Sequence, residues 1–234
     1  MYKIQYGNTT ISYEIIKSER RKTSEITVDR DRVLLRIPHT KSIPEAKKII
    51  AQKLQWIFKK QLYYANQKPE TPEEKFTNGS LLAFRGKNYV IKIVQNRNKS
   101  VKLSGKFLEF HILEKKCTKK QIKEMYQEWL NKKAEPYFAK LVKKYSSMIG
   151  VKPNKIIIKN LKDRWGSTTE RGEINLNANI MKAPNLVINY VILHEICHLK
   201  IKEHSFHFWE MLSKYMPKYK EQTKWLEVNG IRIT

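Results

Sequence analysis

The sequence predicts an α+β protein: an N-terminal, antiparallel β-rich region with one long helix, followed by a second α+β region. Residues 1 to about 38 alternate apolar and polar side chains, as half-buried strands do. Residues 118–149 instead place apolar side chains at helical spacing, and residues 186–199 are apolar almost all round. Because the periodicity changes near Lys115, we expect two domains, at 1–115 and 116–234.

The first region is expected to contain strands, one helix and then further strands. Ser42 is a candidate N-cap for a helix over about 44–67, whose apolar side should pack on the preceding strands. A proline-containing loop at 68–75 follows. The candidate strands are Ile11–Ile15, Ser24–Val28, Arg32–Ile37, Ser80–Phe84, Lys87–Val94, Ser100–Leu103 and Lys106–Ile112. Because residues 1–113 show no catalytic pattern, this region is expected to cover the second, shape a cleft or bind a partner.

The second region is expected to begin with one or two helices over 118–149, with Gly150 as the C-terminal cap. A strand at Lys155–Lys159 and a hairpin at Lys162–Asn177 follow. The remaining elements should be an apolar helix introduced by Ala183-Pro184, a helix from Ser205, a short helix through Trp225 and a strand at Ile231–Ile233.

The composition describes a basic, globular chain. It has 47 Lys and Arg against 22 Asp and Glu, a formal net charge of +25. Such an excess suggests polyanion binding, with nucleic acid as the first candidate, although lysines spread through nearly every segment are also typical of a solvated surface. The two cysteines, Cys117 and Cys197, predict reduced thiols and no disulfide framework. Since neither a signal-like nor a membrane-spanning run is present, a cytoplasmic protein without a membrane partner is expected.

His194, Glu195 and His198 form the pattern H-E-x-x-H, and His204 follows six residues after His198. Helix positions four apart lie on one face, so His194 and His198 can bind one ion. Three imidazoles on Zn²⁺ leave a fourth position for water, which is typical of catalytic zinc sites. Glu195 is then placed beside that water as the general base. The pattern predicts a metallohydrolase with one zinc ion, and a peptidase first.

The alternative is an amphipathic helix whose two histidines only fill polar positions. The surrounding segment argues against it, because Leu186 to Leu199 is apolar almost all round and such helices are normally buried. A buried carboxylate and two buried imidazoles are costly unless they are paired or bound to metal. Nearby, His207 could be a further ligand, and Glu203 and Glu210 could accept from a ligand imidazole, but ordinary surface roles are favoured for these three.

Helix, strand, hairpin and then a helix with H-E-x-x-H is the order found in small zincin domains. In that fold an edge strand can pair with an extended protein or peptide substrate over the metal. The return arm Gly172–Asn177 is the candidate edge strand, and Arg164, Trp165, Asn175 and Asn177 are candidate substrate-binding residues beside it. Stabilisation of the hairpin alone is the alternative role for these side chains.

Five segments of the second region carry further motifs: R-W-G-S at Arg164–Ser167, I-N-L-N at Ile174–Asn177, A-P at Ala183-Pro184, Y-V-I-L-H-E-I-C-H-L at Tyr190–Leu199 and H-S-x-x-F-W at His204–Trp209. Together they resemble the YgjP-like metallopeptidases, predicted zinc-dependent hydrolases related to the SprT-like and WLM proteases. Looser matches extend the resemblance over nearly the whole chain. It implies a minimal zincin-like domain, zinc on His194, His198 and His204, and Glu195 as the catalytic residue.

Two positions depart from related patterns. Thr168 follows Ser167 where members of the family often have Cys, so no role can be carried over for a thiol. The spacing from His198 to His204 equals that of the metzincins, but Ile201 stands where those enzymes have Gly. The chain is therefore not interpreted as a metzincin.

The leading hypothesis is a zinc metallopeptidase. The alternatives are a protease that acts on nucleic-acid-bound proteins, and a basic nucleic-acid-binding protein whose zinc site has another hydrolytic function. Esterase or amidase chemistry on a small molecule also stays open, because activation of water by zinc does not specify the carbonyl that is attacked.

Overall fold

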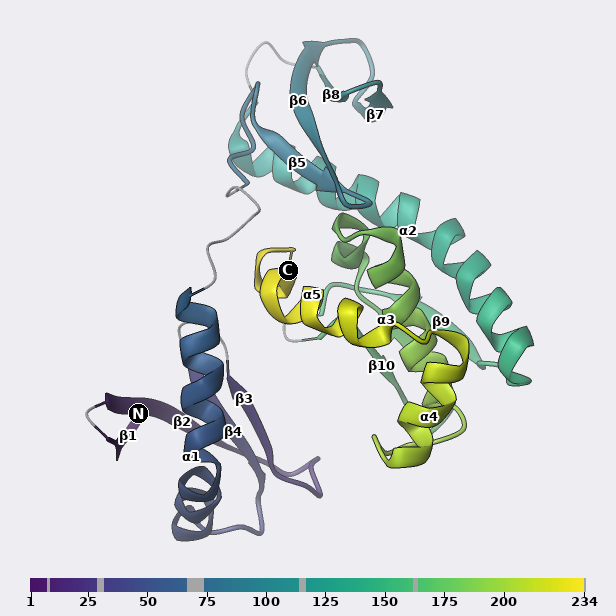
Figure 1. Cartoon of the computed structure of the whole chain (residues 1–234). Helices are drawn as coiled ribbons and strands as arrows, with labels where there is room; N and C mark the ends of the chain where they lie inside the picture. Colours follow the sequence, from purple (N-terminus) through teal and green to yellow (C-terminus); the bar gives the residue numbers. More distant parts are fainter. Residues whose placement is uncertain (8, 29–31, 67–73, 114–116, 162–163, 234) are drawn as a thin grey trace. The chain divides into compact units, whose positions relative to one another are not determined.

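The computed structural model describes residues 1–7, 9–28, 32–66, 74–113, 117–161 and 164–233. The chain divides into two compact units, Met1–Glu70 and Thr71–Thr234, each with its own hydrophobic core (Figure 1). Blocks of strands alternate with helices, which confirms the predicted α+β class. Among the described residues, no helix has the length and apolar composition needed to cross a bilayer.

The first unit is a four-stranded sheet followed by one long helix. Its strands are β1 (Tyr2–Tyr6), β2 (Thr9–Ser18), β3 (Glu25–Val28) and β4 (Val33–Pro38), in the order β1-β2-β4-β3. The helix α1 (Ile43–Asn66) begins as predicted after Ser42, whose backbone N–H donates to the Glu45 carboxylate at 2.7 Å. Ala46, Ile50 and Ile57 of α1 share one core with β2 and β4, so the predicted packing of the helix is confirmed.

The second unit opens with a sheet of the same topology. Its strands are β5 (Leu81–Phe84), β6 (Lys87–Gln95), β7 (Ser100–Ser104) and β8 (Phe107–Ile112), in the order β5-β6-β8-β7. In both sheets the outer pairs are antiparallel and the central pair is parallel. A long helix follows each sheet, so one arrangement of four strands and a helix occurs twice along the chain.

The prediction of an antiparallel β-rich region was therefore wrong for the central strand pairs. β2 runs parallel to β4, and β6 runs parallel to β8. After β2 the chain first forms β3 at the edge of the sheet and then returns as β4, between β2 and β3. Because β4 is antiparallel to β3, it runs in the same direction as β2. Alternation of apolar and polar side chains reports a half-buried strand but not the direction of its neighbour.

The division between compact units also differs from the expected boundary at residue 115/116. It lies between Glu70 and Thr71, because β5–β8 share one core with the following helix α2 (Lys119–Ile149). The rings of Phe84 on β5 and Trp129 on α2, for example, have centroids 4.6 Å apart. The change of periodicity near Lys115 thus marks a change of element within one unit. That residues 116–234 form the peptidase domain stays a prediction.

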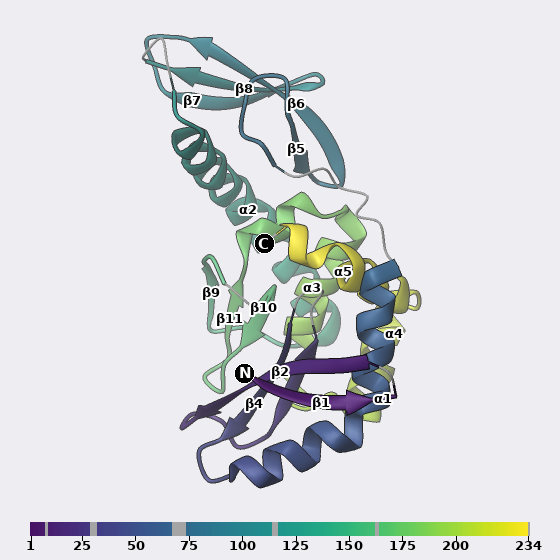
Figure 2. The same cartoon turned by 90° about the vertical axis from the view of Figure 1, so that its left-hand side faces the viewer.

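α2 is one helix with both predicted ends. Thr118 forms a capping box with Gln121, and Gly150 has the left-handed conformation of a C-terminal cap (φ 74°). A three-stranded sheet follows, made of β9 (Lys155–Ile158), β10 (Gly166–Thr168) and β11 (Glu173–Leu176) (Figure 2). The predicted hairpin is confirmed as the antiparallel pair β10–β11. Residues 162 and 163 of that prediction lie outside the described residues.

The order β10-β11-β9 shows that the predicted edge strand was wrong. β11 contains most of the return arm Gly172–Asn177 and lies in the centre, because β9 pairs with its outer side in parallel register, Ile174 opposite Ile156. The edges are β9 and β10. Spacing within the hairpin could not reveal this, since β9 comes from before the hairpin.

The chain ends in four helical elements: the short 3₁₀ helix η1 (Ala178–Lys182), α3 (Asn185–Cys197), α4 (Phe206–Tyr215) and α5 (Tyr219–Ile233). α3 packs against both α2 and α5 (Figure 1). The predicted strand at Ile231–Ile233 was wrong, because α5 continues through it. Gly230 lies inside α5, where an added Cβ would stand 3.5 Å from the ring of Trp165.

The turn between β5 and β6 is fixed against the segment that leads into α3. The backbone N–H of Arg85 donates to the carbonyl of Met181 at 2.7 Å, and that of Gly86 donates to Lys182 at 3.2 Å. Gly86 has φ 76°, and a Cβ at this position would lie 2.8 Å from Cα of Pro184. The turn and the start of α3 therefore approach as closely as a glycine allows.

Gly86→Ala is expected to lower the free energy of unfolding by about 3 kcal/mol in urea titrations, since positive φ and steric overlap both oppose the new methyl group. Gly105→Ala is the matched control: Gly105 also has positive φ (55°), but nothing lies within 4 Å of the position that its Cβ would take. We expect the control to lose only about 1 kcal/mol. Equal losses in the two variants would show that the contact with Pro184 contributes nothing.

Candidate metal centre

The last turn of α3 carries the H-E-x-x-H residues. His194 and Glu195 lie within the helix, and His198 is its C-terminal cap residue, with its backbone N–H donating to the carbonyl of His194 at 3.3 Å. The rest of the helix is buried on several sides, as its apolar sequence predicts. A tight turn then follows, in which Ile201 N–H donates to the carbonyl of Cys197, and the chain returns to place His204 at the site.

The three histidines converge on one point. Nε2 of His194 lies 3.1 Å from Nε2 of His198 and 2.9 Å from Nε2 of His204, and the latter two atoms are 3.1 Å apart. Three nitrogens at about 2.0–2.1 Å from a tetrahedral Zn²⁺ would be about 3.3 Å apart, close to these distances. Among the described residues, these histidines form the group of side chains able to hold a metal ion.

Hydrogen bonding alone does not account for this convergence. Nδ1 of His198 lies 3.0 Å from the carbonyl of Ile201, which can only accept, so Nδ1 carries the proton and Nε2 presents a lone pair. Burial, and then the neighbouring His198 and His204, lower the pKa of His194 to about 3. Burial also lowers the pKa of His198 and of His204. Low pKa values keep the imidazoles neutral, and a neutral imidazole can offer an Nε2 lone pair to a cation, so the donor set fits a divalent metal.

Aromatic rings hold the imidazoles in place. Phe208 is fully buried, stacks on His198 at 4.6 Å between centroids, and meets His194 and His204 edge-on. Trp209 stacks on His204 at 5.4 Å and on Tyr219 of α5 at 5.3 Å, which makes a continuous stack. His204, which comes from a loop, is thus oriented by α4 and α5. His194 Nδ1 is buried without a hydrogen-bond partner among the described residues, so packing sets the orientation of that ring too.

Glu195 lies on the side of α3 that faces β10. Its side chain is buried, at 6% exposed, and the Thr168 hydroxyl lies 2.9 Å from Oε2. A Cβ added at Gly166 would stand 2.7 Å from Cγ of Glu195, so the strand can approach the carboxylate only because residue 166 has no side chain. Burial raises the pKa of Glu195 to about 7, against smaller lowering effects of Thr168 and Arg164. A carboxyl group with this pKa is suited to exchange protons near neutral pH.

The four predicted substrate-binding residues have different environments. Arg164 is exposed, just before β10, and its charge acts on Glu195. Trp165 is half-buried and packs against Gly230 of α5. Asn175 is buried, and its amide lies 3.3 Å from the Ser167 hydroxyl. Of Arg164, Trp165 and Asn175, only Arg164 is an exposed residue that a ligand could contact freely.

Asn177 is fully buried and holds the loop before β10. Its amide donates to the carbonyl of Leu161 at 2.7 Å and of Arg164 at 3.3 Å, and its oxygen accepts from the N–H of Asn179 at 3.0 Å. The Asn177 side chain therefore fixes the backbone at the start of the R-W-G-S segment by hydrogen bonds. This corresponds to the alternative role, stabilisation of the hairpin.

The other polar residues near the motif lie at the surface. His207 is 78% exposed and its Nδ1 lies 3.5 Å from Oε2 of Glu210, which is 64% exposed. Glu203 is also exposed. Among the described residues, none of these three belongs to the metal-holding group.

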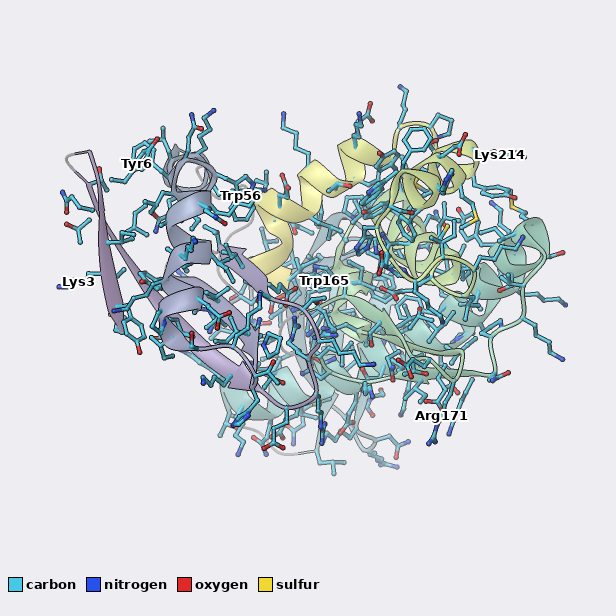
Figure 3. All side chains as sticks on the ribbon, turned by 90° about the horizontal axis from the view of Figure 1, so that it is seen from below. Lys3, Tyr6, Trp56, Trp165, Arg171 and Lys214 are labelled. Carbon is cyan, nitrogen blue, oxygen red and sulfur yellow. The ribbon has the colours of Figure 1, made fainter. Side chains whose placement is uncertain are left out.

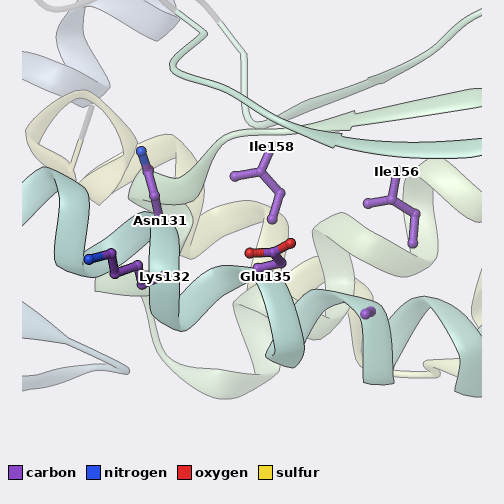
Figure 4. Close-up of a pocket in the computed structure, with 6 residues that line it drawn as sticks. Asn131, Lys132, Glu135, Ile156 and Ile158 are labelled. Atoms are coloured by element: carbon purple, nitrogen blue, oxygen red, sulfur yellow. The ribbon is translucent and has the colours of Figure 1, made fainter.

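A separate cavity of 460 Å³ lies between α2 and β9 (Figure 4). Its lining residues are Asn131, Lys132, Glu135, Ala139, Ile156 and Ile158. None of them is a histidine or belongs to α3 or α4. The cavity is therefore distinct from the histidine cluster.

The sequence had assigned no role to Gly166, Thr168, Phe208 or Trp209. Gly166, Phe208 and Trp209 were visible as parts of motifs, but a motif does not state which side chain it contacts. Thr168 was noted only as a departure from cysteine. Its contact with Glu195 joins residues 27 positions apart and follows from the docking of the hairpin on α3.

A buried helix that ends in a three-histidine cluster and carries a buried glutamate has the donor set and the carboxylate of a metallohydrolase site. The family model for the YgjP-like metallopeptidase domain matches residues 22–229. The chain therefore belongs to the YgjP-like metallopeptidase family, which confirms the resemblance drawn from its motifs, and it is a metal-binding hydrolase with peptidase activity. No curated protein matches the chain.

Two solved structures of archaeal metallopeptidase zymogens show a partial likeness. Abylysin of Pyrococcus abyssi is 24% identical over 39% of this chain and 97% of its own, with a TM-score of 0.36. Jannalysin of Methanocaldococcus jannaschii is 23% identical over 37% of this chain and 84% of its own, with a TM-score of 0.34. At these scores the likeness places no constraint on the site of this chain.

Metal-free Glu195→Gln is expected to unfold less readily than the metal-free wild type at pH 8, by about 3 kcal/mol in urea titrations, because burial raises the pKa of Glu195 from 4.5 to about 7. A raised pKa in the folded state gives stability that is present below about pH 4.5 and is lost as the pH rises through about 7. The difference between the variants should therefore shrink to about 1 kcal/mol at pH 5.

Glu124→Gln, at an exposed position of α2, serves as the control and should show no comparable gain at pH 8. Histidine titration is common to all three proteins and cancels in the differences. A destabilised Glu195→Gln variant at pH 8 would contradict the costly burial of the carboxylate.

Proposed function

We propose that the chain is a zinc-dependent peptidase in which His194, His198 and His204 hold one Zn²⁺ ion and Glu195 is the general base. The observation that carries the proposal is the convergence of three Nε2 atoms within 2.9–3.1 Å of one another beside a buried carboxylate. Three neutral imidazoles suit zinc better than calcium or magnesium, which prefer oxygen ligands.

A zinc ion held by this set would supply a Lewis acid and lower the pKa of a water to about 7. The residues of the chain then have separate tasks. Glu195 accepts the proton of the attacking water and passes it to the leaving amine, for which a pKa of about 7 is well matched. The rings of Phe208 and Trp209 orient the imidazoles, and Thr168 contacts the carboxylate.

The substrate is proposed to be an extended protein or peptide segment that pairs with β10. Because β11 is central, β10 (Gly166–Thr168) is the sheet edge next to Glu195. Backbone pairing at an edge strand fixes a peptide in register without regard to most of its side chains. Arg164 is exposed just before this edge, which supports a role in attracting a carboxylate or carbonyl of the substrate.

Metal analysis and a protease assay on the full chain test the proposal together. We expect one zinc per chain, hydrolysis of fluorescein-labelled casein, and loss of hydrolysis with 1,10-phenanthroline. Glu195→Gln should keep its zinc and lose about 100- to 10,000-fold in rate, since the general base is removed without a ligand. Glu124→Gln is the control. Substoichiometric zinc, or undiminished hydrolysis by Glu195→Gln, would refute the proposal.

A second candidate function is a protease directed to proteins on nucleic acid, and one feature of the first unit favours it. From Ala46 to Asn66, α1 has five lysines and no acidic residue. Trp56, labelled in Figure 3, is 43% exposed, with Lys53 and Lys59 one turn away on either side. An exposed indole between lysines can stack on a base while the lysines neutralise phosphates.

Binding of a fluorescein-labelled 20-nucleotide single-stranded DNA tests this candidate. We expect the affinity to fall more than about tenfold between 50 and 200 mM KCl, and Trp56→Ala to weaken binding about tenfold at 50 mM. Leu62→Ala, an equally exposed apolar position on α1, is the matched control and should bind as wild type. No binding at 50 mM, or the same loss in both variants, would dismiss the candidate.

A further inference from the structure

The Thr168 hydroxyl meets Glu195 at two atoms. It lies 2.9 Å from Oε2 of the carboxylate and 2.7 Å from the backbone carbonyl of the same residue. The hydrogen bond described for the carboxylate is therefore to Oε2, and it joins Thr168 on β10 to Glu195 on α3. A hydroxyl on a strand two residues beyond Gly166 reaches the carboxylate because side chains 166 and 168 lie on the same face of β10.

We propose that Thr168 is a positioning residue for the catalytic carboxylate: its hydroxyl holds Oε2 of Glu195 against β10, so that Oε1 is the oxygen presented to water. The proposal rests on the function proposed above, since it assigns Thr168 a role in the same reaction. Three features determine where the carboxylate lies. α3 carries its backbone, the missing side chain at Gly166 leaves room for Cγ and Oε1 beside β10, and the Thr168 hydroxyl contacts Oε2.

The chemistry of the residue matches this task. A free glutamate side chain has several rotamers, and a general base that samples them loses rate because few encounters have the right geometry. The single hydroxyl proton of Thr168 can be donated to the Glu195 carbonyl or to Oε2; an ionised carboxylate is the stronger acceptor, so the bond to Oε2 favours one rotamer. Valine has the shape of threonine without the hydroxyl, and serine has the hydroxyl without the methyl group, so the two substitutions separate packing from hydrogen bonding.

A role in fold stability alone is the competing explanation, since the same hydroxyl also joins β10 to the carbonyl of Glu195. In that case Thr168→Val would loosen the hairpin, and its effect would not depend on the carboxylate. A double-mutant cycle with Glu195→Gln separates the two explanations, because positioning matters only while there is a carboxylate to position.

The experiment uses the full zinc-loaded chain and an internally quenched peptide that the wild type cleaves. We expect Thr168→Val to lower kcat about 10- to 100-fold with KM within about twofold, and Thr168→Ser to stay within about threefold of wild type. In the Glu195→Gln background, Thr168→Val should change kcat less than about twofold. Zinc content should stay at one per chain throughout. Thr9→Val, at an exposed position of β2, is the matched control.

A readout independent of activity is the crystal structure of each metal-free variant. We expect Glu195 to adopt one conformer in the wild type and in Thr168→Ser, and more than one, or a different one, in Thr168→Val. An unchanged conformer in Thr168→Val, or equal loss of kcat in both backgrounds, would overturn the positioning role. If Glu195→Gln itself retains full hydrolysis, the proposed function fails instead, which distinguishes the two failures.

Discussion

The structure of the second unit depends on one constraint: a carboxylate and three imidazoles must be kept at the end of an apolar helix, where their charges are poorly solvated. Burial lowers the pKa of His194 to about 3 and raises that of Glu195 to about 7, so both groups favour their neutral forms without metal. A divalent cation removes the conflict for the imidazoles, and it supplies a positive charge beside the glutamate. The surrounding elements hold these groups in place despite the free-energy cost of burying them.

Each element around α3 supplies one part of that arrangement. The β5–β6 turn and η1 fix the start of the helix through Gly86 and Lys182. The hairpin brings Gly166 and Thr168 to Glu195, and Asn177 supports the hairpin from inside. The α4 and α5 helices add the stack of Tyr219 and Trp209 on His204. The first unit repeats the strand order of the second and carries its own core, so it is a separate fold with a separate surface.

The sequence predicts a feature well when the residues that determine it are close together in the chain, and poorly when they are far apart. Local features were predictable: Ser42 marks the start of α1, Gly150 ends α2, and the spacing from His194 to His204 predicts residues that the structure brings together. Features set by distant pairing were not, since the parallel pairs β2–β4 and β6–β8 and the central place of β11 depend on which strand arrives beside which. The contact of Thr168 with Glu195 belongs to this second kind, because neither residue indicates the other in sequence.

The close approach of Gly166 to Glu195 has a consequence for the order in which the molecule matures. The histidines of α3 can form their helix locally, but the carboxylate reaches its position only when the hairpin docks, and His204 only when α4 and α5 stack. These contacts join segments distant in the chain, which form late because their loops must close first. A partly folded chain therefore lacks both the third imidazole, that of His204, and the aligned carboxylate of Glu195.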